Sequence, residues 1–320
     1  MAENRDCVLG IDTSNYTTSA AVVSREGSVI INAERLLSVK HGERGLRQSD
    51  ALFGHMENLP DIIGTVLNDT TRDRIAGIAV SDKPRPVEGS YMPVFRAGET
   101  AGVILGNAYD VPVMRFSHQE GHIAAIKEFS ELRDRDRVLF YHLSGGTTEL
   151  LKVTGCSGPG MDTEIIGHTL DISAGQLIDR TGVALGFDFP AGRFLDDIAV
   201  KSAENGNRTL SRLTPVKVKE SSFNLSGIET QAMRLAESGE SASKLAPALL
   251  AELAECLAKA VINASGRTGI DDVIFGGGVS CSRFIRGIIS EKLPSAVFGE
   301  YSSDNAVGTA MLGRKALWPL

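Results

Sequence analysis

The chain has 320 residues, of which 42% are hydrophobic and 23% are charged, so it can bury a large hydrophobic core. Its length approaches the upper limit for a domain with a single hydrophobic core. Its net charge of -7 argues against a general affinity for nucleic acid, although the short runs 217–219 and 283–286 could supply a local basic patch. No apolar run approaches the roughly 20 residues that cross a bilayer, and no secretory signal is recognisable. We therefore expect a two-lobed cytoplasmic protein without membrane contact.

Two segments that lie 130 residues apart resemble each other. Val, Leu, Ser and two Thr residues of segment 8–18 recur at the same spacing in segment 138–148. Each segment reads as an apolar strand, a turn of small polar residues and the beginning of a second strand. The interpretation is a duplicated β-hairpin whose turns offer N–H and hydroxyl groups to phosphate, and chance similarity of two hairpins is the alternative.

Around these hairpins strands alternate with helices, which favours an α/β class. In the first half the pattern predicts strands at 29–34, 77–81 and 111–116, and helices at 49–67, at 98–108 and after residue 117. In the second half it predicts helices at 173–185, 193–202 and 242–265 and a strand at 272–275. We expect a first lobe at 1–130, completed by 300–320, and a second lobe at 131–299.

A pair of histidines follows the strand predicted at 111–116. His118 and His122 would lie on one face of a helix, about 5 to 6 Å apart, which suits two imidazoles on one metal ion. Ligand sites of α/β folds gather at such strand ends. Asp304 offers a carboxylate as a third ligand, and an Asp at a loop-to-helix junction is equally typical of a helix N-cap. Histidines with a purely structural role are the alternative.

Glycine-rich turns follow two other predicted strands, at 144–148 and 275–280. The amides of the first could cradle a phosphate and the glycines of the second permit close approach of a nucleoside, while both are also compatible with ordinary tight turns. Asp171, Gly175 and Asp179 recur at intervals of four residues and therefore predict one helix face. That face would offer carboxylates to the hydroxyls of a ligand or would simply be solvated.

In their order along the chain these segments resemble the TsaD family, the tRNA threonylcarbamoyladenosine synthases. The resemblance rests on VLGIDTS from Val8, H-x-E-G-H from His118, LSGGTTELLKVTG from Leu143, GHTLDISAGQLIDR from Gly167, FPAG from Phe189, FNLSGIET from Phe223, GGGVS from Gly276 and SDNA from Ser303. No single motif is diagnostic, but the ordered set covers nearly the whole chain. The resemblance implies the two-lobed actin-like ATPase (ASKHA, ribonuclease H-like) fold with duplicated lobes.

The resemblance also implies a site and a reaction. The family's metal ligands match His118, His122 and Asp304, a set compatible with iron(II) or zinc. Its positions for an adenine nucleotide, whether ATP, AMP or an adenylate, and for substrate match His142, Leu143, Ser144, Gly145, Gly146, Asp179, Gly192, Asp196, Gly277 and Ser282. The family moves a threonylcarbamoyl group from its adenylate to the adenosine beside the anticodon of tRNA. We therefore expect a metal-dependent threonylcarbamoyl or carbamoyl transferase, with subunits of a threonylcarbamoylation complex as candidate partners.

Several substrate-facing positions depart from the family pattern. Thr147 stands where the family has His, Ser282 where it has Asn, and Glu229 where it has Lys. The acidic residue that follows the family's first strand is absent from 13–17, and its A-G-P-G stretch is replaced at 82–86. The chain thus reads as a divergent paralogue. The alternative function is a non-catalytic, nucleotide-binding partner subunit of a tRNA-modification complex, which would bind nucleotide without turnover. A kinase does not account for the paired histidines, and the peptidase motif H-E-x-x-H does not occur.

Overall fold

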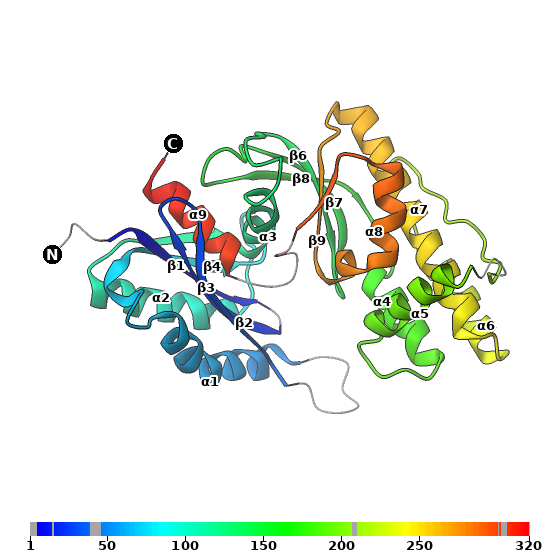
Figure 1. Cartoon of the computed structure of the whole chain (residues 1–320), viewed down its shortest axis with the longest axis horizontal. Coiled ribbons are helices and arrows are strands. Elements are labelled where there is room, and N and C mark those ends of the chain that lie inside the picture. Colours follow the sequence, from blue (N-terminus) through cyan, green and yellow to red (C-terminus); the bar gives the residue numbers. More distant parts are fainter. Residues whose placement is uncertain are drawn as a thin grey trace. The chain divides into compact units, whose positions relative to one another are not determined.

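A computed structural model describes residues 5–14, 16–38, 46–206, 210–299, 301 and 306–319 of the chain. The chain divides into two compact units. Unit 1 comprises Met1–Asp136, Thr154–Asp162 and Gly299–Leu320, and unit 2 comprises Arg137–Val153 and Thr163–Phe298. Within the described residues, each unit contains a five-stranded sheet with helices packed against it (Figure 1).

The sheet of unit 1 has the strand order β3-β2-β1-β4-β5. Its strands are β1 (Cys7–Ser14), β2 (Thr17–Ser24), β3 (Val29–Leu36), β4 (Ile75–Lys83) and β5 (Val113–Ser117). The first three form an antiparallel meander, and β4 and β5 continue the sheet parallel to β1. β1 and β2 are buried along their whole length, as expected for strands covered on both faces.

Helices cover both faces of this sheet. They are α1 (Gln48–Val66), α2 (Phe95–Tyr109), α3 (His118–Lys127) and α9 (Val307–Leu317), with a short 3-10 turn at Arg72–Arg74. Leu9 and Ile11 of β1 share a hydrophobic cluster with side chains of α1 and α2. Gly10 points to the opposite face, because successive residues of a strand alternate. A Cβ at Gly10 would lie 2.6 Å from the carbonyl oxygen of Ala306, just before α9, so α9 packs directly on the backbone of β1.

The packing of α3 against α9 also depends on glycine. A Cβ at Gly308 would lie 1.8 Å from the carbonyl oxygen of Gly121 in α3, so the two helix backbones are in contact. Near the end of α9 the ammonium of Lys315 lies 2.6 Å from the carboxylate of Glu128, and both side chains are buried. The helix that begins at Val307 is therefore an integral part of the unit 1 core.

The sheet of unit 2 has the order β10-β9-β6-β7-β8. Its strands are β6 (Val138–Leu143), β7 (Thr148–Thr154), β8 (Asp162–His168), β9 (Val273–Gly276) and β10 (Ala296–Phe298). Its helices are α4 (Ala174–Ala184), α5 (Gly192–Glu204), α6 (Ser226–Glu237), α7 (Ala242–Thr268) and α8 (Arg283–Lys292), and a 3-10 turn covers Gly278–Cys281. The core of the unit contains Leu245, Leu249, Leu253 and Leu257 of α7, which are spaced at the predicted helical interval.

The two sheets are copies of one topology. Read from its meander, each sheet begins with three consecutive strands and continues with two strands parallel to the first. Val8 pairs with Val23 in the β1–β2 hairpin, and Val138 pairs with Val153 in the β6–β7 hairpin. Both partners are thus shifted by 130, the offset found in the sequence. The predicted duplication is confirmed as equivalence of strand register.

Most of the predicted elements form with boundaries shifted by a few residues. Among the strands and α-helices that the structure describes, β8, β10 and α6 were not predicted. β8 is an edge strand with the mixed sequence DTEIIGH, and β10 has three residues, so neither carries a strong apolar pattern. The predicted helix face of Asp171, Gly175 and Asp179 is wrong, because Ser173 caps α4 and leaves Asp171 outside the helix. Among the described residues, no helix combines the length and apolarity needed to span a bilayer.

Candidate functional site

Two of the predicted site residues lie together at the junction of β5 and α3 in unit 1. The junction is a capping box: the Ser117 hydroxyl accepts a hydrogen bond from the N–H of Glu120, and the Glu120 carboxylate accepts from the N–H of Ser117. This cap starts α3 at His118 and places His122 one turn further on. The centroids of the two imidazole rings are 4.3 Å apart, and both side chains are buried. The structure therefore brings the two rings together at the carboxyl end of a parallel strand.

A carboxylate from the first strand holds His118. The Oδ2 atom of Asp12 lies 2.9 Å from Nδ1 of His118 and accepts a hydrogen bond of 2.5 Å from the Ser81 hydroxyl, while its Oδ1 accepts one from the N–H of Ser14. Burial alone would raise the pKa of Asp12, but the His118 imidazole and these two donors together hold that pKa below its ordinary value. Asp12 therefore favours its charged form and holds the Nδ1 side of the His118 ring.

The arrangement fits a metal site in its donor chemistry. Ligating histidines characteristically give their second ring nitrogen to a carboxylate, which orients the ring and raises its basicity. Asp12 stands in that relation to His118, and His122 supplies a second imidazole. The predicted third ligand, Asp304, lies outside the described residues. The described residues contain no group of three or more His, Cys, Asp or Glu side chains that could hold a metal.

In unit 2 the turn between β6 and β7 is open to solvent. The N–H of Ser144 donates to the carbonyl of Thr147, and the N–H of Thr147 donates to the Ser144 hydroxyl. Gly145 and Gly146 at its tip are exposed, and a Cβ at either position would meet no atom within 4 Å. The replaced family position, Thr147, thus closes the turn through its backbone.

The turn lies against the amino-terminal end of α4. The hydroxyl of Ser173, the N-cap of this helix, donates to the carbonyl of Gly145 at 2.6 Å. Gly175 permits the contact, since a Cβ there would lie 2.6 Å from the Cα of Gly145. The amino-terminal end of α4 therefore adjoins an exposed diglycine turn. The Ala174 and Gln176 N–H groups donate to the hydroxyls of Thr148 and Ser173, and the positive end of the helix dipole favours an anion at the turn.

Gly277 brings the end of β9 onto the end of β6. Its φ is +90°, and a Cβ there would lie 2.4 Å from the carbonyl oxygen of Leu143 and 3.2 Å from the His142 ring. His142 is half-buried and stacks near Phe140. The Leu143 side chain is fully buried in the core, so this residue could reach a ligand only through its backbone.

The remaining predicted residues of unit 2 are engaged in helix caps. Asp179 accepts a hydrogen bond of 2.8 Å from the N–H of Ala191, just before α5 begins at Gly192. Burial raises the pKa of Asp179, although its hydrogen bonds from the N–H groups of Ala191 and Gly192 act to lower it. Asp196 is buried and accepts from the Ser282 hydroxyl and from backbone N–H groups in the first turn of α8. Asp179 and Gly192 therefore form one local contact and Asp196 and Ser282 another.

Sequence reasoning missed Asp12 and Ser81. The sequence contained a signal for Asp12, because it is a lone carboxylate inside an apolar strand and corresponds to His142 at the offset of 130.

Asp171 does not lie on the helix face predicted for it. Its carboxylate accepts hydrogen bonds from the N–H groups of Leu225 and Ser226 at the start of α6. These bonds outweigh the effect of burial and hold the pKa of Asp171 well below its usual range.

Comparison with known proteins agrees with this architecture. A solved structure of full-length HypF in its phosphate- and nucleotide-bound form superimposes with a TM-score of 0.60 over 98% of this chain and 56% of that one, at 13% identity. The 2-hydroxyglutaryl-CoA dehydratase component A of Acidaminococcus fermentans gives a TM-score of 0.56 over 97% and 98% of the two chains, at 12% identity. Both likenesses concern the fold, which is the actin-like ATPase fold with duplicated sheets.

Curated sequences identify the family. A tRNA N6-adenosine threonylcarbamoyltransferase of Syntrophotalea carbinolica is 29% identical over 330 residues, which cover 96% of this chain and 89% of that protein. One of Neorickettsia sennetsu is 26% identical over 298 residues, covering 90% and 85% of the respective chains. Residues 35–311 match the TsaD family, described as tRNA N6-adenosine threonylcarbamoyltransferase, and the chain therefore belongs to this family of transferases.

Proposed function

We propose that this protein transfers a threonylcarbamoyl group from its adenylate to the exocyclic amine of the adenosine beside the anticodon of tRNA. The amine nitrogen bonds to the carbamoyl carbon, the bond from that carbon to the phosphate oxygen breaks, and AMP leaves while the amine loses a proton. The observation that carries the proposal is the buried pair of imidazoles at the strand ends, of which His118 contacts Asp12. The chain that contains this pair belongs to the transferase family.

The residues of unit 1 fit a divalent metal, iron(II) or zinc, which His118 and His122 would hold together with Asp304. When bound, it would supply Lewis-acid polarisation of the carbamoyl carbonyl and would orient the phosphate. Asp12 positions His118 by accepting at Nδ1, and Ser81 and Ser14 in turn position Asp12. The burial of Asp12, at 1% exposure, keeps water from competing for these hydrogen bonds.

The glycine turn of unit 2 supports the nucleotide part of the proposal. The exposed tip at Gly145 and Gly146 lacks side chains that would keep a phosphate from the backbone N–H groups. The adjoining N-terminus of α4 adds the positive end of a helix dipole. Gly278, which is exposed and where a Cβ would meet no atom within 4 Å, leaves the end of β9 open to a nucleoside in the same way.

One set of contacts favours the alternative function, a non-catalytic nucleotide-binding partner subunit. Ser282 donates to Asp196 in the cap of α8, and Glu229 pairs with Arg180 at 3.0 Å. Two positions that depart from the family pattern are thus engaged within the chain. A partner subunit would retain the nucleotide site of unit 2 and would not need the imidazole pair.

The test measures metal content, nucleotide binding and transfer to unmodified tRNA in the same preparations. We expect the wild-type chain to carry near-stoichiometric metal, and His118→Ala and His122→Ala each to lose the metal and at least about 100-fold in transfer rate. His168→Ala, which removes an exposed histidine of β8, serves as the control and should change neither quantity. Equal binding of ATP and AMP without metal, combined with no transfer even when partner subunits are added, would establish the non-catalytic alternative instead.

A further inference from the structure

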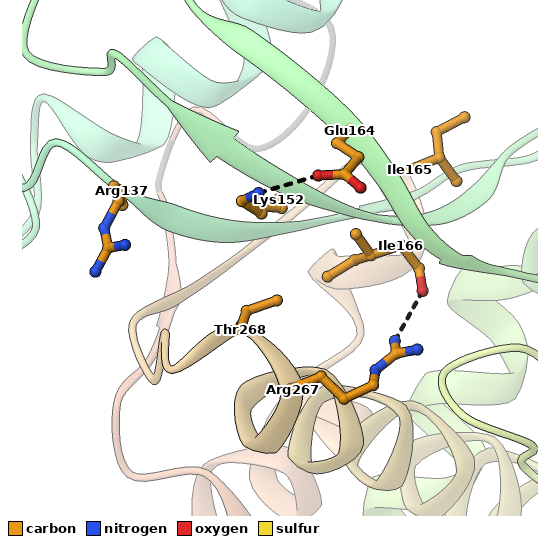
Figure 2. Close-up of a pocket in the computed structure, with 7 residues that line it drawn as sticks. All are labelled: Arg137, Lys152, Glu164, Ile165, Ile166, Arg267 and Thr268. Carbon is orange, nitrogen blue, oxygen red and sulfur yellow. Dashed lines mark hydrogen bonds and ion pairs between the residues drawn. The ribbon is translucent and has the colours of Figure 1, made fainter.

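Unit 2 contains a cavity that none of the candidate site residues lines. Its volume is about 590 Å³. It lies where β6 begins, beside β7, the edge strand β8 and the carboxyl-terminal end of α7 (Figure 2). Its lining consists of Arg137, Lys152, Glu164, Ile165, Ile166, Arg267 and Thr268.

The lining carries an excess of positive charge. Three cationic side chains face one carboxylate, in a chain whose net charge is -7. Two isoleucines add an aliphatic surface, and Ile165 is 46% exposed. The basic run 217–219, in which Lys219 is exposed, ends immediately before Glu220, whose carboxylate pairs with Arg267.

The three cations differ in how firmly they are held. Arg267 is fixed in place, because its guanidinium donates to the Ile166 carbonyl at 3.0 Å and to the Ser221 hydroxyl at 2.8 Å in addition to its contact with Glu220. Its guanidinium is therefore held in place beside the cavity, with Glu220 as its counter-ion. Arg137 is exposed and forms no hydrogen bond or ion pair with any residue that the structure describes.

Lys152 has a partner that it can exchange. Its ammonium lies 3.0 Å from the Glu164 carboxylate, and the two side chains are 37% and 65% exposed. Solvent-exposed pairs of this kind contribute little net stability, so a phosphate can replace the carboxylate at small cost. Glu164 thus acts as an internal competitor for any anion that enters the cavity.

We propose that this cavity binds the phosphate backbone of tRNA. This inference rests on the proposed function and extends it to the binding of the acceptor tRNA. The lining offers cationic side chains and aliphatic surface, the groups that hold a sugar–phosphate backbone without reading its sequence. Its described residues include neither an aromatic ring that could stack on a base nor a helix N-terminus that could hold a terminal phosphate. The cavity therefore suits a polymer backbone better than a free nucleotide.

The experiment measures the affinity of the full chain for a labelled tRNA, by fluorescence anisotropy over a range of KCl concentrations. The acceptor adenosine of this tRNA is replaced by guanosine, so that binding is observed without transfer. We expect Arg137→Ala and Lys152→Ala each to weaken binding about 3- to 10-fold and to lower the salt slope by about 1. Glu164→Gln should strengthen binding about 3-fold, because it removes the internal competitor.

The chain provides a matched control. Lys292 and Glu255 form a pair of 2.9 Å on α8 and α7 with exposures of 38% and 51%, and neither residue lines the cavity. Lys292→Ala and Glu255→Gln change the net charge by the same amounts as the test variants, and we expect them to leave the tRNA affinity within 2-fold of wild type. Thermal unfolding of each variant confirms that it is folded.

The outcomes separate this inference from the proposed function. Unchanged affinity in the cavity variants, equal effects in the control pair, or no binding of tRNA by the wild-type chain would each overturn the cavity's role. Transfer to native tRNA is measured in parallel. A chain that shows the expected affinity changes but no transfer would retain the cavity contact while the transferase proposal fails, and the opposite result would retain only the transferase.

Discussion

The ends of β1 and β6 are equivalent positions in two copies of one sheet, yet they present different chemistry. At the end of β1 lies Asp12, a buried carboxylate bound to His118 and Ser81. The residue at the same register in β6 is His142, whose ring stacks near Phe140 and lies beside Gly277. One topology thus carries a candidate site of ionisable side chains in unit 1 and, in unit 2, a candidate site that depends on glycine and main-chain atoms. The first should fail when a charge is lost and the second when a Cβ is added.

Gly277→Ala should have the largest effect. The substitution places a Cβ 2.4 Å from the Leu143 carbonyl at a φ of +90°, so we expect unit 2 to lose about 3 kcal/mol of unfolding free energy and nucleotide binding to be abolished. Urea unfolding and calorimetric titration with AMP would measure both. Gly287→Ala on α8, outside the candidate site, is the control, since a Cβ there meets no atom within 4 Å. Equal losses in the two variants would show that the close contact with β6 is not what matters.

Asp12→Asn should have the next largest effect and should act on unit 1. The amide keeps the shape of Asp12 but removes the charge that orients His118, so metal affinity and transfer rate should each fall about 10- to 100-fold. Metal titration followed by transfer assays at saturating metal would measure the change. Ser14, which donates to the same carboxylate through its backbone, offers a control: Ser14→Ala retains that N–H and should behave as wild type. Full metal affinity in Asp12→Asn would refute the role of the carboxylate.

How much of this contrast the sequence could predict depends on distance along the chain. The alternation of strands and helices, the duplicated hairpins and the spacing of His118 and His122 are local patterns, and the structure contains all three. Asp12 and His118 are 106 residues apart and meet only because β1, β4 and β5 lie side by side in the sheet. Asp196 and Ser282 meet for a similar reason, through the packing of α5 on α8. Contacts between residues so far apart in the sequence depend on strand order and helix packing, which local sequence patterns do not predict.

Asp171→Asn should have the smallest effect of the three substitutions. Asp171 is an exposed carboxylate of unit 2 that caps a helix, whereas Asp12 of unit 1 is buried and contacts a histidine. Because its folded pKa lies below the unfolded value of about 3.9, Asp171 stabilises the fold above that value and loses the effect as the pH falls through the folded pKa. We expect the variant to be about 1 kcal/mol less stable than wild type at pH 7, with a smaller difference at pH 3.

Urea unfolding at the two pH values would measure this difference, with the exposed Asp188→Asn as the control. A difference that is the same at pH 7 and pH 3 would contradict the assignment of the lowered pKa to the cap of α6.

The position of α9 has a consequence for the order in which the protein is made. Unit 1 is built around strands near the start of the chain, but it buries a helix that begins at Val307 and whose Lys315 pairs with Glu128. A ribosome releases every strand and helix of unit 2 before that helix. Until α9 is made, the face of the unit 1 sheet that contains Gly10 lacks the helix that packs on it. Unit 2 can therefore fold before unit 1 is complete. Chains that are truncated before residue 307 and released from the ribosome should therefore protect unit 2 from protease and leave unit 1 sensitive.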